Sequence, residues 1–243
     1  MSEDPLAARF DGQIAVVTGV GRAGQVGEMV AREFGRRGAA VAVIDVNPSF
    51  AEERAAALRA EGLTVSAYGC DLTDTVATTD VARRIAESQG GKIHVLANIA
   101  GGFAMSGPVA ESDPAVFQRQ LAINLGSAYG ATRACLPYLR AARGAVVFMS
   151  SAAVLPGGKV ANLSAYAAAK AGVIALMRAV AQEEHIHGVR ANAIAPTAIR
   201  TTSNLGSMGD KFAYVEREAV AAMIAFLSSA AAVNVSGQVI ELS

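Results

Sequence analysis

The chain has 243 residues, enough for one α/β domain with a large core or for two small domains. Hydrophobic residues make up 52% of it and charged residues 17%, a composition that argues against a disordered protein. The formal net charge is zero and no basic run stands out, which argues against nucleic acid as the main partner.

Cysteine and histidine are scarce, with two Cys and three His. This predicts neither a disulfide framework nor a metal site, and it fits a reducing compartment. Residues 1–5 are acidic and lack the apolar core of a signal peptide. The longest apolar run, residues 219–227, is too short to cross a bilayer. We therefore expect a cytoplasmic protein without a membrane partner.

The first part of the chain predicts a strand, a glycine loop, a helix and a second strand. Residues 14–17 and 40–44 are continuous apolar runs of the kind that buried parallel strands show. Between them, residues 19–24 read G-x-G-x-x-G and precede a helical pattern that ends near residues 35–38. This order is the dinucleotide-binding βαβ signature, in which the glycines and the helix N-terminus receive a pyrophosphate. A plain tight turn is the alternative.

Asp45 ends the second strand and favours NAD over NADP. An acid at this place hydrogen-bonds the adenosine ribose hydroxyls, and its charge repels a 2′-phosphate. Arg22, in the glycine loop, is the opposing observation, because a guanidinium can pair with a phosphate. We therefore expect NAD as the cofactor, with NADP less favoured.

The rest of the chain continues the alternation. We expect helices at residues 50–61, 76–89, 113 to 140–144 despite Pro137, 164–187 and 219–228, strands at residues 64–68, 93–97, 145–149, 189–195 and 238–242, and an irregular polar segment at residues 197–217. About seven strands and six helices predict a single Rossmann-type domain over residues 1–243, with one doubly wound parallel sheet. Ligands bind beyond the carboxyl ends of such strands. Chemistry-bearing residues fall at those ends, namely Gly19, Asp45, Asp71, Asn98, Ser151 and Pro196.

Tyr166 and Lys170 stand four positions apart in an alanine-rich run that predicts a helix. Residues with this spacing share one helix face. A free phenol has a pKa of about 10, and a nearby cation lowers it. Tyr166 is therefore a candidate for exchanging a proton with a carbonyl or alcohol oxygen. An incidental pair on a surface helix is the alternative.

Together these motifs resemble the short-chain dehydrogenase/reductase family, in its compact branch, over nearly the whole chain. Thr18-Gly19 with Gly24 and Gly27 resembles the family's TGxxxGxG loop. Residues 98–101 resemble its NNAG motif and residues 192–197 its NAxxPG motif. The family's catalytic tetrad is matched by Asn124, Ser151, Tyr166 and Lys170.

The resemblance implies hydride transfer between a nicotinamide cofactor and a secondary alcohol or ketone, with Tyr166 as general acid/base. Lys170 would lower the pKa of Tyr166 and bind the nicotinamide ribose, Ser151 would polarise the substrate oxygen, and Asn124 would hold a proton-relaying water. The implied cofactor ligands are Gly19, Gly21, Arg22, Gly24, Val26, Gly27, Asp45, Val46, Asp71, Leu72, Asn98, Ala100, Gly101, Tyr166, Lys170, Pro196, Ile199 and Thr201.

Ser151 and Tyr166 would bind the substrate together with Phe103 and Leu155. Further apolar or aromatic candidates, Met105, Met208, Phe212 and Tyr214, suggest a lipophilic small molecule such as a 3-oxoacyl group or a ring ketone, although a core role is equally open. The family also implies a homotetramer, or a homodimer, formed through the helices over residues 113–143 and 164–187.

The chain departs from the family pattern in three places. The loop from Gly19 to Gly27 is longer than in the family, and Ser151 stands further from Tyr166 in the sequence. The segment at residues 197–217, which corresponds to the family's substrate lid, is shorter. A dinucleotide-binding sensor or scaffold without catalysis is therefore the alternative from another class, although such a protein has no need of the tyrosine–lysine pair. An epimerase or dehydratase of the longer related branch would need a substrate domain for which the chain has no length.

Single residues have alternatives too. Ser150 rivals Ser151, and Asn124 within a helix could only satisfy backbone groups. Asn98 could be a turn residue and Asp71 a helix cap.

Overall fold

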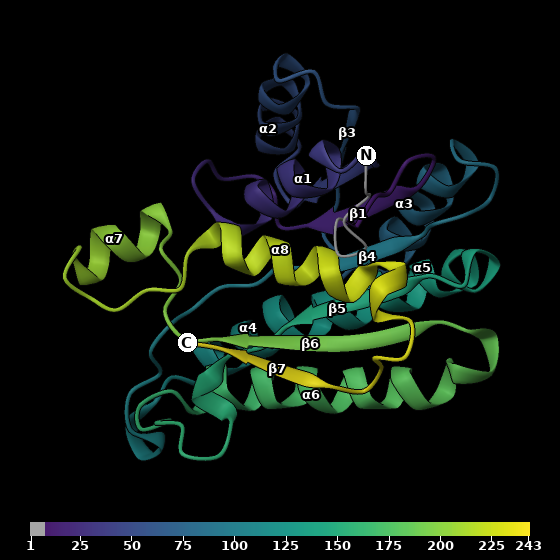
Figure 1. Ribbon diagram of the computed structural model, residues 1–243. Coiled ribbons are helices and arrows are strands. Elements are labelled where there is room, and N and C mark those ends of the chain that lie inside the picture. The colour runs from purple at the N-terminus through teal and green to yellow at the C-terminus, as the bar shows by residue number, and fades with distance from the viewer. Residues whose placement is uncertain (1–7) are drawn as a thin grey trace.

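The computed structural model describes residues 8–243, so the acidic segment at residues 1–5, which predicts that no signal peptide is present, lies outside the described residues. Seven strands in the described part form one parallel sheet in the order β3-β2-β1-β4-β5-β6-β7 (Figure 1). They are β1 (Ile14–Thr18), β2 (Ala40–Asp45), β3 (Val65–Gly69), β4 (Val95–Asn98), β5 (Ala145–Met149), β6 (Arg190–Pro196) and β7 (Val239–Leu242). The predicted doubly wound α/β fold is confirmed.

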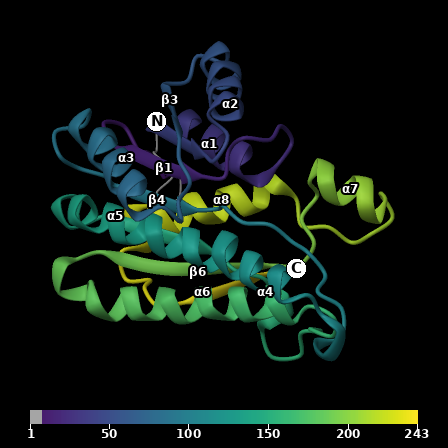
Figure 2. The same ribbon diagram turned by 180° about the vertical axis from the view of Figure 1, so that it is seen from behind.

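Helices cover both faces of the sheet (Figure 2). The α-helices in the described residues are α1 (Val26–Arg36), α2 (Pro48–Ala60), α3 (Thr75–Glu87), α4 (Pro114–Gln120), α5 (Ser127–Ala142), α6 (Ser164–Glu183), α7 (Thr202–Met208) and α8 (Arg217–Ser228). One core lies between the sheet and α1, α2 and α8, and a second lies between the sheet and α3, α5 and α6. The site is therefore built on loops held by two packed layers.

The apolar runs of the strands follow from this double covering. Ala15 and Val17 of β1 belong to the core under α1, whereas Ile14 and Val16 belong to the opposite core. Successive side chains on a strand point to opposite faces, so a strand covered on both sides needs apolar residues at every position. The strand predicted at residues 145–149 is accordingly found at Ala145–Met149.

Two predicted elements differ from the structure. The helix expected from residue 113 begins as predicted, with Asp113 as its cap and Pro114 as its first residue, and it continues through Pro137. A π-helical segment, Leu121–Gly126, however, divides it into α4 and α5. The segment at residues 197–217 is not irregular throughout, because Thr202–Met208 forms α7. That helix has no buried residue, so it lacks the apolar periodicity by which a helix is recognised.

The strand order reverses between β1 and β4, which are neighbours in the centre of the sheet. Connections after these two strands leave towards opposite ends of the sheet, and ligands of such folds bind at that point. The loops concerned are residues 19–25 and 99–113. The α7 helix projects from the body at the edge where β7 and the chain end, as both views show (Figures 1 and 2).

Among the described residues, α6 is the one helix that is long and apolar enough to cross a membrane by length and composition. Its apolarity has a cause within the fold. Val173, Met177 and Val180 pack into the core beneath the sheet, as expected for the core helix of an α/β protein.

Candidate active site

Ser150 and Ser151 directly follow β5, and their surroundings differ. The Ser150 hydroxyl is buried and donates a 3.0 Å hydrogen bond to the Lys170 carbonyl, so it ties the end of the strand to α6. Ser151 is partly buried, and its Oγ accepts a 3.3 Å hydrogen bond from the Ala153 amide. Its hydroxyl also hydrogen-bonds with the Tyr166 phenol. The geometry therefore favours Ser151 as the serine of the site.

Lys170 and Tyr166 lie together on α6, as their spacing predicts. The Nζ atom of Lys170 lies 5.7 Å from the centre of the Tyr166 ring and donates a 2.9 Å hydrogen bond to the Met149 carbonyl. The side chain is only 4% exposed, and burial lowers the pKa of its ammonium to about 8.

The electrostatics of the phenol differ from the sequence expectation. Burial raises the pKa of Tyr166, and hydrogen bonding with Ser151 offsets part of that rise. The expected lowering of this pKa by Lys170 is not seen, and the ammonium hydrogen-bonds to the Met149 carbonyl instead of the phenol. In this arrangement, Ser151 is the group that lowers the pKa of the phenol.

Asn124 lies in the π-helical segment and is 1% exposed. Its Oδ1 accepts a 3.2 Å hydrogen bond from the Gly102 amide, and its Nδ2 donates to the carbonyls of Gly102 and Gln120 at 3.0 and 3.1 Å. A Cβ atom on Gly101 would lie 2.5 Å from Asn124 Oδ1 and 3.6 Å from Lys170 Nζ. Asn124 thus satisfies backbone groups and also lies beside Lys170, and π-helical segments are frequent at functional sites.

The glycine loop packs backbone against backbone. Gly19 has φ 72°, and a Cβ there would lie 2.7 Å from the Ala100 Cα atom. A Cβ on Gly27 would collide with the Gly19 carbonyl oxygen, so no larger residue fits between the loop and the start of α1. Val26 is buried in the core. These close approaches are the cradle that a dinucleotide pyrophosphate requires.

Asp45 and the longer glycine loop contact each other. The Gly21 amide donates to one carboxylate oxygen of Asp45 at 2.7 Å, and the Asn47 amide donates to the other at 3.0 Å. A Cβ on Gly21 would lie 2.5 Å from Asp45 Cγ. The additional residues of the loop are therefore folded against the acid predicted to bind the ribose. Arg22 is exposed and has no partner within residues 8–243.

Other predicted cofactor residues lie at neighbouring strand ends. Asp71 is exposed, and hydrogen bonds from the Thr73 hydroxyl and amide, at 2.7 and 2.9 Å, hold the pKa of its carboxyl below the usual value. Asp74 caps α3, so the alternative of Asp71 as a helix cap is wrong. The Leu72 side chain is buried in the core, which leaves only its backbone for a ligand, whereas Val46 is exposed.

Asn98 ends β4 and is 4% exposed. Its Nδ2 donates a 2.9 Å hydrogen bond to the Thr132 hydroxyl, while its Oδ1 is buried without a partner among the described residues. A buried carbonyl oxygen of this kind costs free energy unless a donor reaches it.

The segment after β6 returns to the glycine loop. Pro196 ends the strand, Ile199 bridges to Val215, and the Thr201 hydroxyl caps α7 by accepting from the Asn204 amide at 3.1 Å. The Thr202 amide donates a 3.2 Å hydrogen bond to the Gly24 carbonyl. The predicted lid therefore touches the predicted cofactor loop.

Apolar side chains lie on the open side of Tyr166. The Phe103 ring packs edge-on against the Tyr166 ring at 5.1 Å between centres, yet it is 63% exposed. Met105 is 62% exposed on the same loop, and Leu155 is half-buried. Met208 and Phe212 are exposed on the lid, whereas the Tyr214 hydroxyl is bonded to the carbonyls of Asn204 and Gly209.

Comparison with known proteins decides the family. The family model described as short chain dehydrogenase matches residues 13–211 of this chain. The chain belongs to the short-chain dehydrogenase/reductase family. The resemblance inferred from its motifs is therefore confirmed, and members of this family use NAD or NADP as cofactor.

Several relatives within the family are similar over nearly their full length. A "(5R,7aS)-5-hydroxy-7a-methyl-1-oxo-2,3,5,6,7,7a-hexahydro-1H-indene-carboxyl-CoA reductase" of Mycobacterium tuberculosis is 37% identical, covering 96% of this chain and 93% of the relative. A D-threitol dehydrogenase of Mycolicibacterium smegmatis is 32% identical, covering 94% and 90%. A meso-2,3-butanediol dehydrogenase of Serratia marcescens is 32% identical, covering 94% and 92%.

Solved structures agree with the fold. A short chain dehydrogenase from Mycobacterium smegmatis has a TM-score of 0.84 at 31% identity, covering 98% of both chains. A citronellol catabolism dehydrogenase of Pseudomonas aeruginosa has a TM-score of 0.84 at 29% identity, covering 97% of this chain and 95% of that one. This short-chain dehydrogenase is thus an oxidoreductase whose relatives act on alcohols and ketones.

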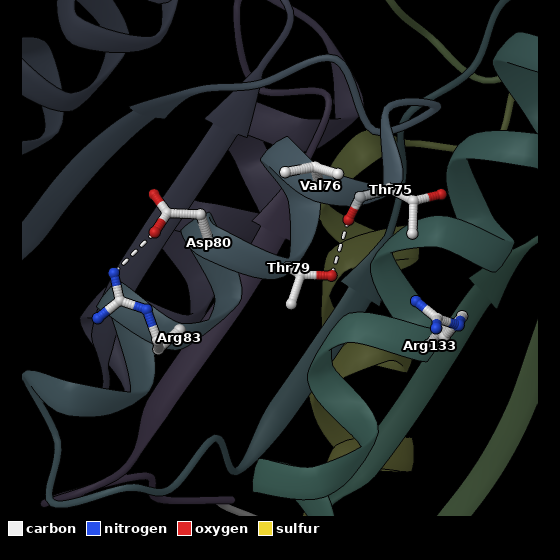
Figure 3. Close-up of a pocket in the computed structure, with 6 residues that line it drawn as sticks. All are labelled: Thr75, Val76, Thr79, Asp80, Arg83 and Arg133. Carbon is white, nitrogen blue, oxygen red and sulfur yellow. Dashed lines mark hydrogen bonds and ion pairs between the residues drawn. The ribbon is translucent and has the colours of Figure 1, made fainter.

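A surface pocket of about 420 Å³ lies away from these residues, on the outer side of α3 and α5 (Figure 3). It is lined by Thr75, Val76, Thr79, Asp80, Arg83 and Arg133. Asp80 and Arg83 form an ion pair with each other, and no predicted site residue contributes. Within residues 8–243, no three His, Cys, Asp or Glu side chains are grouped so that they could hold a metal ion.

Sequence reasoning missed several residues that support the site. The buried Thr18 hydroxyl accepts 3.0 Å hydrogen bonds from the Ile99 and Ala100 amides and joins the two central loops. Glu28, in the first turn of α1, accepts a 2.6 Å hydrogen bond from the Gly24 amide. Arg217 lies beside Gly24. The position of Thr18 directly before the glycine motif was a signal in the sequence. The partners of Glu28 and Arg217 left no such signal, because they depend on tertiary packing.

Proposed function

We propose that this short-chain dehydrogenase transfers a hydride between NAD(H) and a secondary alcohol or ketone, with Tyr166 as the general acid/base. The observation that carries the proposal is the arrangement of Tyr166 beside Ser151 and the buried Lys170, where β5 ends. Three polar groups of the required types converge at the edge of the sheet where ligands of this fold bind.

In the reduction direction, the Ser151 and Tyr166 hydroxyls would both donate hydrogen bonds to the substrate carbonyl oxygen. That oxygen becomes negative as hydride arrives, so donors already in place stabilise the developing charge. The bound nicotinamide supplies or accepts the hydride. The Tyr166 phenol then gives its proton to the oxygen, and in the oxidation direction it takes the proton back.

A phenol whose pKa is raised by burial is protonated at neutral pH, so the proton that the reduction consumes is present on Tyr166. The reverse reaction needs a phenolate, and the ammonium of Lys170 is the nearby cation that would stabilise it. We propose that the proton lost by Tyr166 is replaced from a water held by Asn124, by way of Lys170. The support is that both side chains approach the same glycine, Gly101.

For the cofactor, we propose NAD rather than NADP. The carboxylate of Asp45 is held in place by the Gly21 and Asn47 amides, so its free lone pairs are already oriented for ribose hydroxyls. A 2′-phosphate would have to approach this fixed negative charge. The hydrogen bonds from these two amides also lower the free-energy cost of ordering the Asp45 side chain when the cofactor binds.

For the substrate, we propose a lipophilic ketone or its alcohol, and a ring ketone in particular. The support is the exposed apolar surface of Phe103 and Met105 beside Tyr166. The name of the Mycobacterium tuberculosis relative describes a bicyclic oxo compound joined to coenzyme A, whereas two other relatives are named for small polar alcohols. Exposed apolar side chains at a site favour the first kind of ligand.

A matched pair of ketones tests this proposal with NADH as the reductant. We expect kcat/KM for a bicyclic or long-chain ketone to exceed that for a short hydroxyketone by about tenfold or more, since each buried CH₂ contributes about 0.8 kcal/mol. Phe103→Ser should reduce this preference and leave turnover of the short ketone unchanged. Equal kcat/KM values for the two ketones would contradict the choice of substrate class.

We also propose a cytoplasmic homotetramer, with a homodimer as the alternative, assembled through α5 and the neighbouring α6. Tyr129 on α5 is 54% exposed, which is unusual for a large aromatic side chain on a surface with no partner. Light scattering after gel filtration should give the mass of four chains, and a single-chain mass would contradict the proposal.

A further inference from the structure

Arg217 combines a charged side chain, partial burial and the lack of a described partner. It is the first residue of α8, and its Nε atom is buried without a hydrogen-bond acceptor among the described residues. None of the ion pairs found within residues 8–243 includes it. A buried guanidinium nitrogen without an acceptor costs free energy, so an acceptor from outside the described chain would stabilise it.

The position of Arg217 indicates which acceptor that is. A Cβ atom on Gly24 would lie 3.5 Å from Arg217 Nη1, so the guanidinium is next to the glycine loop. The loop is fastened there by the lid, because Gly24 also accepts hydrogen bonds from Thr202. Gly24 stands just before α1, and the N-terminus of the helix after a glycine loop is the place where βαβ units hold a pyrophosphate.

The charges around the loop leave Arg217 available. Glu28 is the carboxylate in the first turn of α1, but it accepts from the Gly24 amide and pairs with Arg32 at 3.1 Å and Arg54 at 3.6 Å. Glu216, adjacent to Arg217 in sequence, pairs with Arg200 at 2.7 Å. Both carboxylates are therefore neutralised by other arginines, and the positive charge of Arg217 is not.

We propose that Arg217 binds the pyrophosphate of the dinucleotide, as a ligand contributed by the C-terminal half of the chain to the N-terminal glycine loop. A guanidinium presents several donors in one plane and matches phosphate oxygens. Asp45 contacts Gly21, while Arg217 lies beside Gly24, so Arg217 serves NAD and NADP equally. This inference rests on the proposed function, since it assumes that a dinucleotide binds.

Arg217 also connects the lid to the glycine loop. Thr202 and Arg217 flank the segment from α7 to α8, and both touch Gly24. A pyrophosphate held by Arg217 would therefore fix both ends of the lid segment against the cofactor loop.

The test measures binding, not turnover. NADH and NADPH are titrated by their fluorescence, and adenosine and ADP-ribose are titrated calorimetrically. Adenosine lacks the pyrophosphate, whereas ADP-ribose contains it. In Arg217→Gln, we expect affinity for NADH, NADPH and ADP-ribose to fall by about the same factor, tenfold or more, with adenosine unchanged, because a hydrogen bond to a charged group is lost. The salt dependence of ADP-ribose binding should also decrease.

Arg36→Gln is the matched control, since it removes an exposed arginine in the last turn of α1, at the end of the helix away from the glycine loop. It should leave the affinity for NADH and ADP-ribose unchanged. If the glutamine variant of Arg217 does not fold, Arg217→Lys decides the matter. Weaker ADP-ribose binding with unchanged adenosine binding supports the inference, because lysine cannot reproduce a two-pronged contact.

Two results would overturn the inference. The first is unchanged ADP-ribose affinity in the Arg217 variants, and the second is an equal loss for adenosine and ADP-ribose, which would mark a structural role. Either result leaves the proposed function standing if the unaltered protein binds NADH. Failure of the unaltered protein to bind any dinucleotide would instead contradict the proposed function itself.

Discussion

The Lys170 ammonium lies 5.7 Å from the centre of the Tyr166 ring, but its hydrogen bond goes to the Met149 carbonyl, 2.9 Å away. The lysine is therefore anchored to the end of β5 before any ligand arrives. Its charge is close enough to stabilise a phenolate, yet it donates no hydrogen bond to the phenol. The proposed catalytic pair is positioned by the sheet as well as by the helix on which both residues stand.

Burial of Lys170 predicts an unusual dependence of stability on pH. The pKa of the ammonium falls from 10.5 in its unperturbed state to about 8 in the fold. Between these two values the unfolded chain binds a proton that the native protein has released, so the free energy of unfolding rises with pH. Below about pH 8 the buried charge costs stability, by about 3 kcal/mol at most, and the cost disappears towards pH 10.5.

Lys170→Met isolates this effect. We expect the stability of the unaltered protein, relative to that of the variant, to increase between pH 8 and pH 10.5 in chemical denaturation experiments. The variant also loses the hydrogen bond to Met149, so the quantity that reports on the ammonium is the change of the stability difference with pH. A difference between the two proteins that stays constant over this range would show that the ammonium is not buried as described.

Thr18 should couple stability to cofactor binding. Its hydroxyl serves the Ile99 and Ala100 amides, so Thr18→Val leaves both donors without their partner and should cost about 1–3 kcal/mol of unfolding free energy. The loop after β4 would also loosen, and NADH affinity should fall. Thr18→Ser keeps the hydroxyl and should behave nearly as the original in both measurements. A valine variant as stable as the serine variant would contradict this role.

Much of this organisation could be predicted from the sequence, because it depends on local patterns. β5 occupies the predicted residues since a strand buried on both faces is a plain apolar run ending at polar Ser150. Tyr166 and Lys170 share a helix face, as their spacing requires. The π-helical turn around Asn124 was not predictable, because a segment of 6 residues is too short to show a periodicity that differs from that of an α-helix.

The remaining differences come from tertiary contacts. α7 has no buried residue, so no apolar pattern marks it, and its contacts are the Thr201 cap and the hydrogen bond from the Thr202 amide to the Gly24 carbonyl. The contact between Arg217 and Gly24 joins residues that are far apart in the chain, and no local signal marks it. The pKa of Tyr166 likewise depends on burial, which the spacing of Tyr166 and Lys170 does not report.

Asp45 should control the choice of cofactor. The unaltered protein should bind NADH at least about tenfold more tightly than NADPH, because the fixed carboxylate meets a 2′-phosphate at close range. Asp45→Asn keeps an acceptor for the Gly21 amide but removes the charge, so the preference should narrow mainly through tighter NADPH binding. Asp71→Asn removes an exposed carboxylate at another strand end and should leave the ratio unchanged. Tighter binding of NADPH by the unaltered protein would show that Arg22 outweighs Asp45.

Replacing Tyr166 by phenylalanine removes the hydroxyl that is proposed to transfer the proton. The variant keeps the ring that packs against Phe103 and loses only the hydroxyl, while Tyr129→Phe removes the hydroxyl of an exposed tyrosine as a control. The measurement is the rate of NADH oxidation by a reducible ketone, alongside a fluorescence titration of NADH binding. We expect Tyr166→Phe to bind NADH as the unaltered protein does and to lose about a thousandfold or more in kcat, with the control unaffected. A Tyr166→Phe variant that turns over at the original rate would contradict the account.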